Sequence, residues 1–261
     1  MILDYDGYLL DVDGVIWING KEIPGSVETV NRLHDMGKAI VFLTNNSTKS
    51  RDEYVKALRD VGISWVGRND IVSSAYVAAR YLSGLAERCY VIGEAGLVGE
   101  LRLAGLEVLD ESSAWSSGAD AVVVGMDRNF NYMKLWTAMK LILEGSLYVA
   151  TNTDRSFPTE RGLAPGAGTM VAAVSAGAGT EPIVVGKPSE HIFREALRSV
   201  GDGKVLMIGD RAETDILGAT KIGIDSAFVL SGAGKTEDLR ALGLEPKYVA
   251  EDLKSLFRSF I

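Results

Sequence analysis

Two aspartates stand one residue apart at the end of an apolar run near the N-terminus, in the string LLDVDGVIW of residues 9–17. Residues i and i+2 of an extended segment point to the same side, so Asp11 and Asp13 are expected to share one site. Two adjacent carboxylates repel each other unless a cation intervenes. A hard divalent ion with oxygen ligands solves this conflict, and Mg²⁺ is the expected one.

Other reactive or anion-binding residues follow further apolar runs. AIVFL leads into Thr44, PIVVG leads into Lys187, and VLMIG leads into Asp210. In an open parallel sheet, ligands bind beyond the carboxyl ends of the strands. If these strands are neighbours, the side chains converge with Asp11 on one crevice. Each residue alone has an ordinary alternative, such as a helix N-cap for Asp210, but their joint occurrence favours a site.

This set of residues is suited to phosphoryl transfer. A metal-bound aspartate is a nucleophile from which no proton has to be removed, and a second aspartate serves as acid for the leaving group and then as base for water. The Thr44 hydroxyl, the N–H groups after it and Lys187 would hold the phosphoryl oxygens, with Asp210 as a further metal ligand. Phosphoryl transfer depends mostly on such positioning and charge stabilisation.

The elements that must position these residues recur along the chain. Short apolar runs, turns and amphipathic helices alternate, which predicts an α/β fold with a largely parallel sheet. The outer alternation stops near residue 76 and resumes at Pro182. We therefore expect a core domain of residues 1–75 and 181–261, with an inserted α/β cap domain at 76–180. Asn19-Gly20 between extended residues predicts a hairpin just beyond the two aspartates.

Composition limits the partners and the compartment. The 261 residues carry a formal net charge of −8 without a basic stripe, so nucleic acid is not an expected partner. No apolar stretch approaches the ~20 residues that span a bilayer, so no membrane contact is expected. The acidic N-terminus is not typical of a signal peptide. The single Cys89 permits no internal disulfide and fits a reducing compartment, so we expect a cytoplasmic protein.

The string SGAGKT at residues 231–236 follows a strand candidate and precedes a helix candidate, as a P-loop does. The full P-loop pattern needs a glycine five residues before Gly234, where Val229 stands. We therefore exclude a nucleotide-binding P-loop.

Four strings resemble the motifs of the haloacid dehalogenase (HAD) superfamily: LLDVDGVIW, VFLTNNST, VVGKP and MIGDRAETDI. Their order is similar to the NagD-like, p-nitrophenylphosphatase branch with a C2-type cap between motifs two and three. The resemblance covers nearly the whole chain and includes the cap strings YVIGEAGL, VVVGMDRNFNYMKL and ATNTD. It implies a Rossmann-like doubly wound core and a Mg²⁺-dependent phosphomonoesterase acting on a small phosphorylated metabolite and on aryl phosphates such as p-nitrophenyl phosphate.

The resemblance also implies a role for each motif residue. Asp11 would form the aspartyl-phosphate intermediate, and Asp13 would be the general acid/base. The metal ligands would be Asp11, the backbone carbonyl of Asp13, and Asp210. The phosphate ligands would be Thr44, Asn45, Asn46 and Lys187.

Three residues are further candidates. Asp215 is expected beside the metal ligands, where it orients Lys187, although the helix dipole also favours an acid in the first turn of a helix. Asn152 and Asp154 begin a cap loop, and such loops help to select the leaving group in this family. A solvated loop without a binding role is the alternative for these two residues.

Two other functions stay open. A phospho-accepting signalling domain also places aspartates, a threonine and a lysine at strand ends, but its acceptor stands on a middle strand and it lacks a large insertion. A protein or peptide phosphatase on the same fold would need access that a large cap limits. The natural substrate is not specified, and a homodimer is one expected assembly because caps in this family often mediate dimers.

Overall fold

The computed structural model of the protein describes residues 2–159 and 161–258. The chain divides into two compact units. Three segments form the first unit, which comprises Met1–Thr44, Asp52–Val72 and Lys187–Ile261. Two segments form the second unit, which comprises Asn45–Arg51 and Ser73–Gly186.

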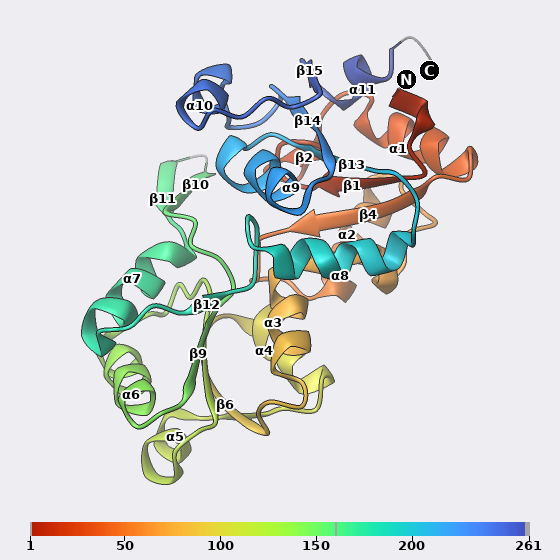
Figure 1. Ribbon diagram of the computed structural model, residues 1–261. Helices are drawn as coiled ribbons and strands as arrows, with labels where there is room; N and C mark the ends of the chain where they lie inside the picture. The colour runs from red at the N-terminus through yellow and green to blue at the C-terminus, as the bar shows by residue number, and fades with distance from the viewer. Residues whose placement is uncertain (1, 160, 259–261) are drawn as a thin grey trace. The chain divides into compact units, whose positions relative to one another are not determined.

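A six-stranded sheet forms the centre of the first unit, with the strand order β15-β14-β13-β1-β4-β5 (Figure 1). The pairings from β15 to β4 are all parallel. All five residues of β1 are buried, as expected for a central strand with helices on both faces. The strands are β1 (Gly7–Asp11), β4 (Ala39–Thr44), β5 (Ile71–Ser73), β13 (Val205–Gly209), β14 (Asp225–Val229) and β15 (Tyr248–Ala250).

Helices cover both faces of this sheet, with α8 and α9 on one side and α1 and α2 on the other (Figure 1). The spacing of Val27, Val30 and Leu33 places three apolar side chains on one face of α1, where they join the core beside Leu10. The α-helices are α1 (Ser26–Asp35), α2 (Arg51–Asp60), α8 (Glu190–Val200), α9 (Leu217–Ile222), α10 (Thr236–Ala241) and α11 (Leu253–Leu256). Two short 3₁₀-helices, η1 (Ile2–Asp4) and η2 (Arg68–Asp70), and one π-helix, η3 (Ala212–Ile216), complete the unit's described helical segments.

The predicted hairpin after the two aspartates is confirmed. β2 (Trp17–Ile18) and β3 (Lys21–Glu22) pair in antiparallel fashion. Asn19 and Gly20 between them have φ values of 51° and 76°. Two successive left-handed residues fit the right-handed twist of the flanking strands, which is why an Asn-Gly pair forms this turn.

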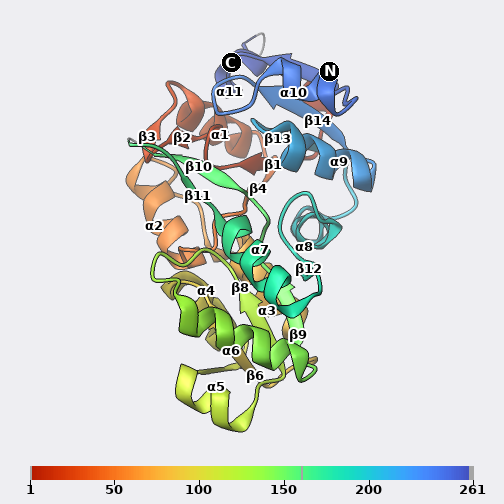
Figure 2. The ribbon, with the colours of Figure 1, turned by 90° about the vertical axis from the view of Figure 1, so that its left-hand side faces the viewer.

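The second unit has its own parallel sheet, in the order β12-β9-β8-β6-β7. Figures 1 and 2 show α6 and α7 side by side on one face of this sheet and α3 and α4 on the other. Leu141 of α6 and Val174 of α7 pack with Val122 of β8 in one core. The strands are β6 (Arg88–Ile92), β7 (Glu107–Leu109), β8 (Ala121–Val124), β9 (Leu147–Ala150) and β12 (Ile183–Val184), with a separate hairpin of β10 (Ser156–Thr159) and β11 (Gly162–Pro165). The helices are α3 (Ser74–Leu82), α4 (Ala95–Leu103), α5 (Glu111–Ser117), α6 (Tyr132–Leu143) and α7 (Ala167–Ala178).

The α/β fold with a doubly wound core and an additional α/β unit is confirmed. One strand was assigned to the wrong sheet, however. The apolar run before Lys187 was expected in the sheet that contains β1, but β12 pairs with β9 at the edge of the second sheet. An apolar run identifies a strand but not its partner, because the partner is chosen by packing between distant segments.

Candidate active site

Neighbouring strands of the first unit bring their carboxyl ends together. β1 ends at Asp11, β4 ends at Thr44, and Asp210 follows β13 directly. β1 runs in register between the other two, with Asp11 opposite Leu43 of β4. The direction of strand progression reverses at β1, and doubly wound sheets bind their ligands at this switch point.

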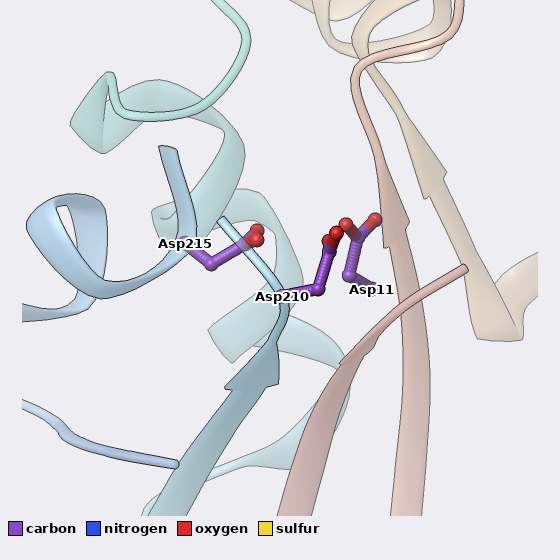
Figure 3. Close-up of side chains that lie close together, drawn as sticks. All are labelled: Asp11, Asp210 and Asp215. Carbon is purple, nitrogen blue, oxygen red and sulfur yellow. The ribbon is translucent and has the colours of Figure 1, made fainter. Parts of the chain in front are cut away.

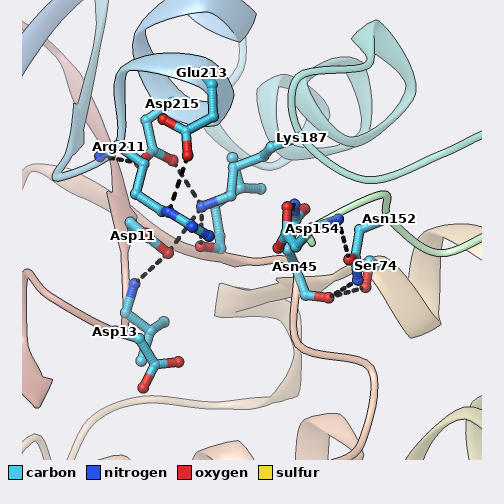
Figure 4. Close-up of polar contacts among 12 residues, drawn as sticks. Asp11, Asp13, Asn45, Ser74, Asn152, Asp154, Lys187, Arg211, Glu213 and Asp215 are labelled. Atoms are coloured by element: carbon cyan, nitrogen blue, oxygen red, sulfur yellow. Dashed lines mark hydrogen bonds and ion pairs between the residues drawn. The ribbon is translucent and has the colours of Figure 1, made fainter. Parts of the chain in front are cut away.

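Lys187 provides a buried positive charge at this edge (Figure 4). Its Nζ lies 2.8 Å from Asp11 Oδ1 and 2.7 Å from Asp215 Oδ1, and all three side chains are buried. Burial by itself lowers the pKa of the Lys187 ammonium, but the two facing carboxylates outweigh it and raise the pKa above its ordinary value. Lys187 is therefore charged and fixed beside Asp11, although the strand before it belongs to the other sheet.

Three carboxylates gather around the end of β1. One oxygen from each of Asp11, Asp210 and Asp215 lies within 4.8 Å of the others, and Figure 3 shows Asp210 and Asp11 pointing toward each other. Asp210 Oδ1 is buried and has no hydrogen-bond partner among the described residues. Burial, and then the charges of Asp11 and Asp215, raise the pKa of Asp210 to about 8. A buried, unpartnered oxygen in an all-oxygen donor set fits a hard divalent cation such as Mg²⁺.

Both oxygens of Asp215 are engaged by protein groups. Oδ1 pairs with Lys187, and Oδ2 accepts a hydrogen bond of 3.0 Å from the Arg211 N–H. Burial raises the pKa of Asp215 to about 6, while the charge of Lys187 opposes the rise. The side chain is fully buried, which is not expected of an acid that serves only the helix dipole. These contacts support the expected role of Asp215 in orienting Lys187.

Asp13 does not join the buried cluster. It is exposed, and Figure 4 shows its carboxylate turned away from that of Asp11. Strand alternation was expected to place both carboxylates on one side, but this does not hold because β1 ends at Asp11. Gly14 then turns the chain with a φ of 92°. The roles of Asp13 as acid/base and as a carbonyl ligand stay predictions.

Sequence reasoning missed two groups that hold these acids. The indole Nε1 of Trp17 donates a hydrogen bond of 2.9 Å to Asp13 Oδ1. The backbone N–H of Ala233 donates one of 2.7 Å to Asp210 Oδ2. Trp17 stands four residues after Asp13 and just before the Asn19-Gly20 turn, and this spacing is a usable signal that the hairpin returns the indole to Asp13. Ala233 lies in the SGAGKT string, whose glycines were tested only against the P-loop pattern.

The other predicted residues lie in the second unit, around the carbonyl of Asn45 (Figure 4). This carbonyl accepts hydrogen bonds from Asn152 Nδ2 at 2.7 Å and from Ser74 Oγ at 2.6 Å. Asn45 Nδ2 donates to both carboxylate oxygens of Asp154 at 3.3 Å. Asn46 uses its side-chain oxygen within its own turn. Asn152 is buried, so this loop is ordered by its own side chains and is not simply solvated.

Comparisons with known proteins agree with this geometry. A haloacid dehalogenase-like hydrolase model matches residues 8–107, and a HAD-hydrolase-like model matches residues 184–256. Phosphoglycolate phosphatase 2 from Arabidopsis thaliana is 36% identical over 278 aligned positions, which cover 97% of this chain and 92% of the relative. The chain belongs to the haloacid dehalogenase-like hydrolases.

Among solved structures, this hydrolase is similar in sequence and fold to p-nitrophenyl phosphatases. The p-nitrophenyl phosphatase from Archaeoglobus fulgidus is 39% identical, with a TM-score of 0.90 over 98% of this chain and 100% of that one. A glycerol phosphate phosphatase from Mycobacterium tuberculosis, solved with magnesium, is 34% identical with a TM-score of 0.88 over 97% and 76% of the two chains. The expected NagD-like branch is confirmed, and the hydrolase is a phosphatase.

These relatives are phosphatases, and they match this chain over nearly its whole length. The match favours a phosphatase over a phospho-accepting signalling domain. Among the described residues of this hydrolase, no helix has the length and apolar character needed to cross a membrane.

Proposed function

We propose that this phosphatase is a Mg²⁺-dependent phosphomonoesterase that hydrolyses a small phosphorylated metabolite, and aryl phosphates such as p-nitrophenyl phosphate, through an aspartyl-phosphate on Asp11. One arrangement carries the proposal. Charged Lys187 faces one side of Asp11, while Asp210 Oδ1 is buried without a partner among residues 2–159 and 161–258. A fixed cation for the phosphoryl oxygens and an anionic donor set for a metal are what phosphoryl transfer needs.

Mg²⁺ would be held by Asp11, Asp210 and the backbone carbonyl of Asp13. When bound, it supplies positive charge that stabilises the phosphoryl group during transfer. Thr44, Asn45, Asn46 and Lys187 would bind the phosphoryl oxygens. Asp215 would keep Lys187 in place through their 2.7 Å ion pair.

In the first step, Asp11 attacks the phosphorus atom. Its Oδ1 accepts a hydrogen bond of 2.8 Å from the Val12 N–H and pairs with Lys187 at 2.8 Å. We therefore assign the attack to Oδ2, the other carboxylate oxygen. The bond from phosphorus to Asp11 forms while the bond to the leaving-group oxygen breaks. Asp13 gives its proton to that oxygen, so the product leaves as an alcohol.

In the second step, water attacks the phosphorus of the aspartyl-phosphate. Asp13 takes a proton from the water, the bond between phosphorus and Asp11 breaks, and inorganic phosphate leaves with the carboxylate restored. The exposure of Asp13 and the hydrogen bond from Trp17 support a group that exchanges protons with solvent and still has a defined position.

The relatives are named for phosphoglycolate, p-nitrophenyl phosphate and glycerol phosphate, which supports a small phosphate monoester as the substrate class. Residues 1–75 and 181–261 would carry the chemistry, and residues 76–180 would form the cap that selects the leaving group. Asn152 and Asp154 would act on selection through the loop that they order around Asn45.

The purified protein is expected to release phosphate from p-nitrophenyl phosphate and from some small metabolite phosphates in the presence of Mg²⁺. EDTA should lower this turnover at least about 100-fold, because the charge stabilisation by the metal is lost, and added Mg²⁺ should restore it. A panel ranked by kcat/KM tests the substrate class. A phosphopeptide ranked first would favour a peptide phosphatase, and a phosphoprotein that lasts for hours without turnover would overturn the proposal.

Metal-free protein is expected to lose stability between about pH 5 and pH 8. The pKa of Asp210 is raised to about 8 in the folded protein, so the folded state holds a proton that the unfolded chain loses near pH 4. Asp210 alone then lowers the free energy of unfolding by about 1.4 kcal/mol for each pH unit until its folded pKa is reached. The raised pKa of Asp215 adds to this fall up to about pH 6. Urea unfolding with EDTA across this range measures the slope.

Asp210→Asn is the control for this slope. It removes the titrating carboxyl, so the fall in stability with pH should be shallower and added Mg²⁺ should stabilise the variant little. If the parent and Asp210→Asn show the same slope with EDTA, the assignment of the proton to Asp210 is wrong.

A further inference from the structure

The segment Ser231–Gly234, which we call the glycine loop, packs directly on Asp210. It follows β14 and was excluded above as a P-loop. The Ala233 N–H donates to Asp210 Oδ2 at 2.7 Å. Ser231 Oγ donates to the carbonyl of Gly14 at 2.7 Å, so the same loop also holds the turn that follows Asp13. Both contacts join residues more than twenty positions apart in the sequence.

The glycines of this loop are required for space. A Cβ atom at position 232 would lie 1.9 Å from Asp210 Oδ2, and one at position 234 would lie 2.0 Å from the Asp210 carbonyl oxygen, whereas real Cβ contacts are not shorter than 3.0 Å. Neither glycine has a left-handed φ, so backbone conformation does not explain them. Gly14 also packs against this carboxylate, because a Cβ atom there would lie 2.5 Å from Asp210 Cγ.

We propose that the glycine loop is a positioning element for the Asp210 carboxylate in the metal site. The backbone N–H of Ala233 donates a hydrogen bond to Oδ2. Gly232 and Gly234 let the loop approach the carboxylate closely enough for this bond to form. This leaves Oδ1, which is buried and unpartnered within the described residues, as the oxygen offered to the cation. The inference rests on the proposed function, since the cation is the proposed Mg²⁺.

The physical reason is that a carboxylate can rotate and can use either oxygen. A hydrogen bond to one oxygen fixes the rotation of the group and decides which oxygen faces the metal. A backbone N–H suits this task because it has no rotamers of its own. Groups that hold metal ligands in this way typically change metal affinity about 10–100-fold when they are lost.

The test is the dissociation constant for Mg²⁺, measured by calorimetry on the full chain after EDTA treatment and dialysis. Gly232→Ala places a methyl group against Asp210 Oδ2, and Ala233→Pro removes the N–H that binds it. We expect both variants to bind Mg²⁺ at least about 10-fold more weakly than the parent.

Two control variants separate positioning from general damage. Ala233→Ser keeps the N–H at an exposed position and should bind Mg²⁺ like the parent. Gly223→Ala strains a left-handed residue at the end of α9, where no atom lies within 4 Å of the added Cβ, so it should lower the melting temperature without changing Mg²⁺ affinity. Circular dichroism and urea unfolding show which variants are folded.

The outcomes differ for the two proposals. A parent that does not bind Mg²⁺ would overturn the metal dependence in the proposed function. A parent that binds Mg²⁺ together with a folded Gly232→Ala or Ala233→Pro of equal affinity would overturn the role of the glycine loop alone. If Gly232→Ala does not fold, the comparison of Ala233→Pro with Ala233→Ser decides the question.

Discussion

Replacing Asp11 with Asn is expected to lower kcat for p-nitrophenyl phosphate by about 10⁴-fold or more, as removal of an enzymatic nucleophile does elsewhere. The amide has nearly the same shape but cannot attack phosphorus, so no aspartyl-phosphate forms. The fold should persist, because Lys187 keeps Asp215 at 2.7 Å and a neutral amide avoids the cost of burying a carboxylate. Release of p-nitrophenolate measures turnover, and urea unfolding measures stability.

Asp60→Asn, at the exposed end of α2, is the matched control and should keep the parental kcat. Intact mass spectrometry after an acid quench should detect a phosphoryl adduct in the parent and in the control but not in Asp11→Asn. Turnover by Asp11→Asn above about one-hundredth of the parental kcat would contradict the nucleophile assignment, since such a residue could not be the only route to product.

The part of the site that depends on local pattern could be predicted from the sequence. Asp11, Thr44 and Asp210 each stand at the end of an apolar run, and the structure places those runs in neighbouring parallel strands. The rule that connects strand ends to ligand binding therefore predicted that these three residues lie at one edge of the sheet, before the fold was known. The motif resemblance added the order of the motifs and the reaction class.

Lys187 and Asp13 show the limit of such reasoning. The apolar run before Lys187 has the composition of a core strand, yet it pairs with β9 of the second sheet. The Lys187 ammonium nevertheless lies beside Asp11, because the charges of Asp11 and Asp215 hold it there. For Asp13, the period of two applies only while the strand continues, and the strand ends at Asp11. Turns and long-range contacts decide where a strand ends, and residue types alone predict that position poorly.

Two of the supporting contacts could not be predicted, because each joins distant segments through a backbone group. The Ala233 N–H and the Ser74 hydroxyl belong to residues with no chemical signature of their own. Their partners, Asp210 Oδ2 and the carbonyl of Asn45, become known only when the chain is folded. The glycines at 232 and 234 were a visible signal, but their meaning depended on the carboxylate packed against them.

Replacing Lys187 with Met is expected to lower the free energy of unfolding by about 3–5 kcal/mol, the usual cost of removing one partner from a buried ion pair. Met keeps most of the length and apolar character of the side chain but leaves Asp11 and Asp215 buried without their counter-charge. Turnover should also be lost, since the phosphoryl oxygens lose their fixed cation. Urea unfolding and p-nitrophenolate release measure the two effects separately.

The double variant Lys187→Met/Asp215→Asn tests whether charge is the cause of that instability. It removes one of the two uncompensated carboxylates, so it should regain at least about 1 kcal/mol relative to Lys187→Met while its kcat stays low. The regain should be larger at pH 8 than at pH 5, because in Lys187→Met the Asp215 carboxyl is neutral at the lower pH and costs less to bury. A double variant less stable than Lys187→Met at pH 8 would show that packing, and not the buried charges, holds Lys187 against the strand ends.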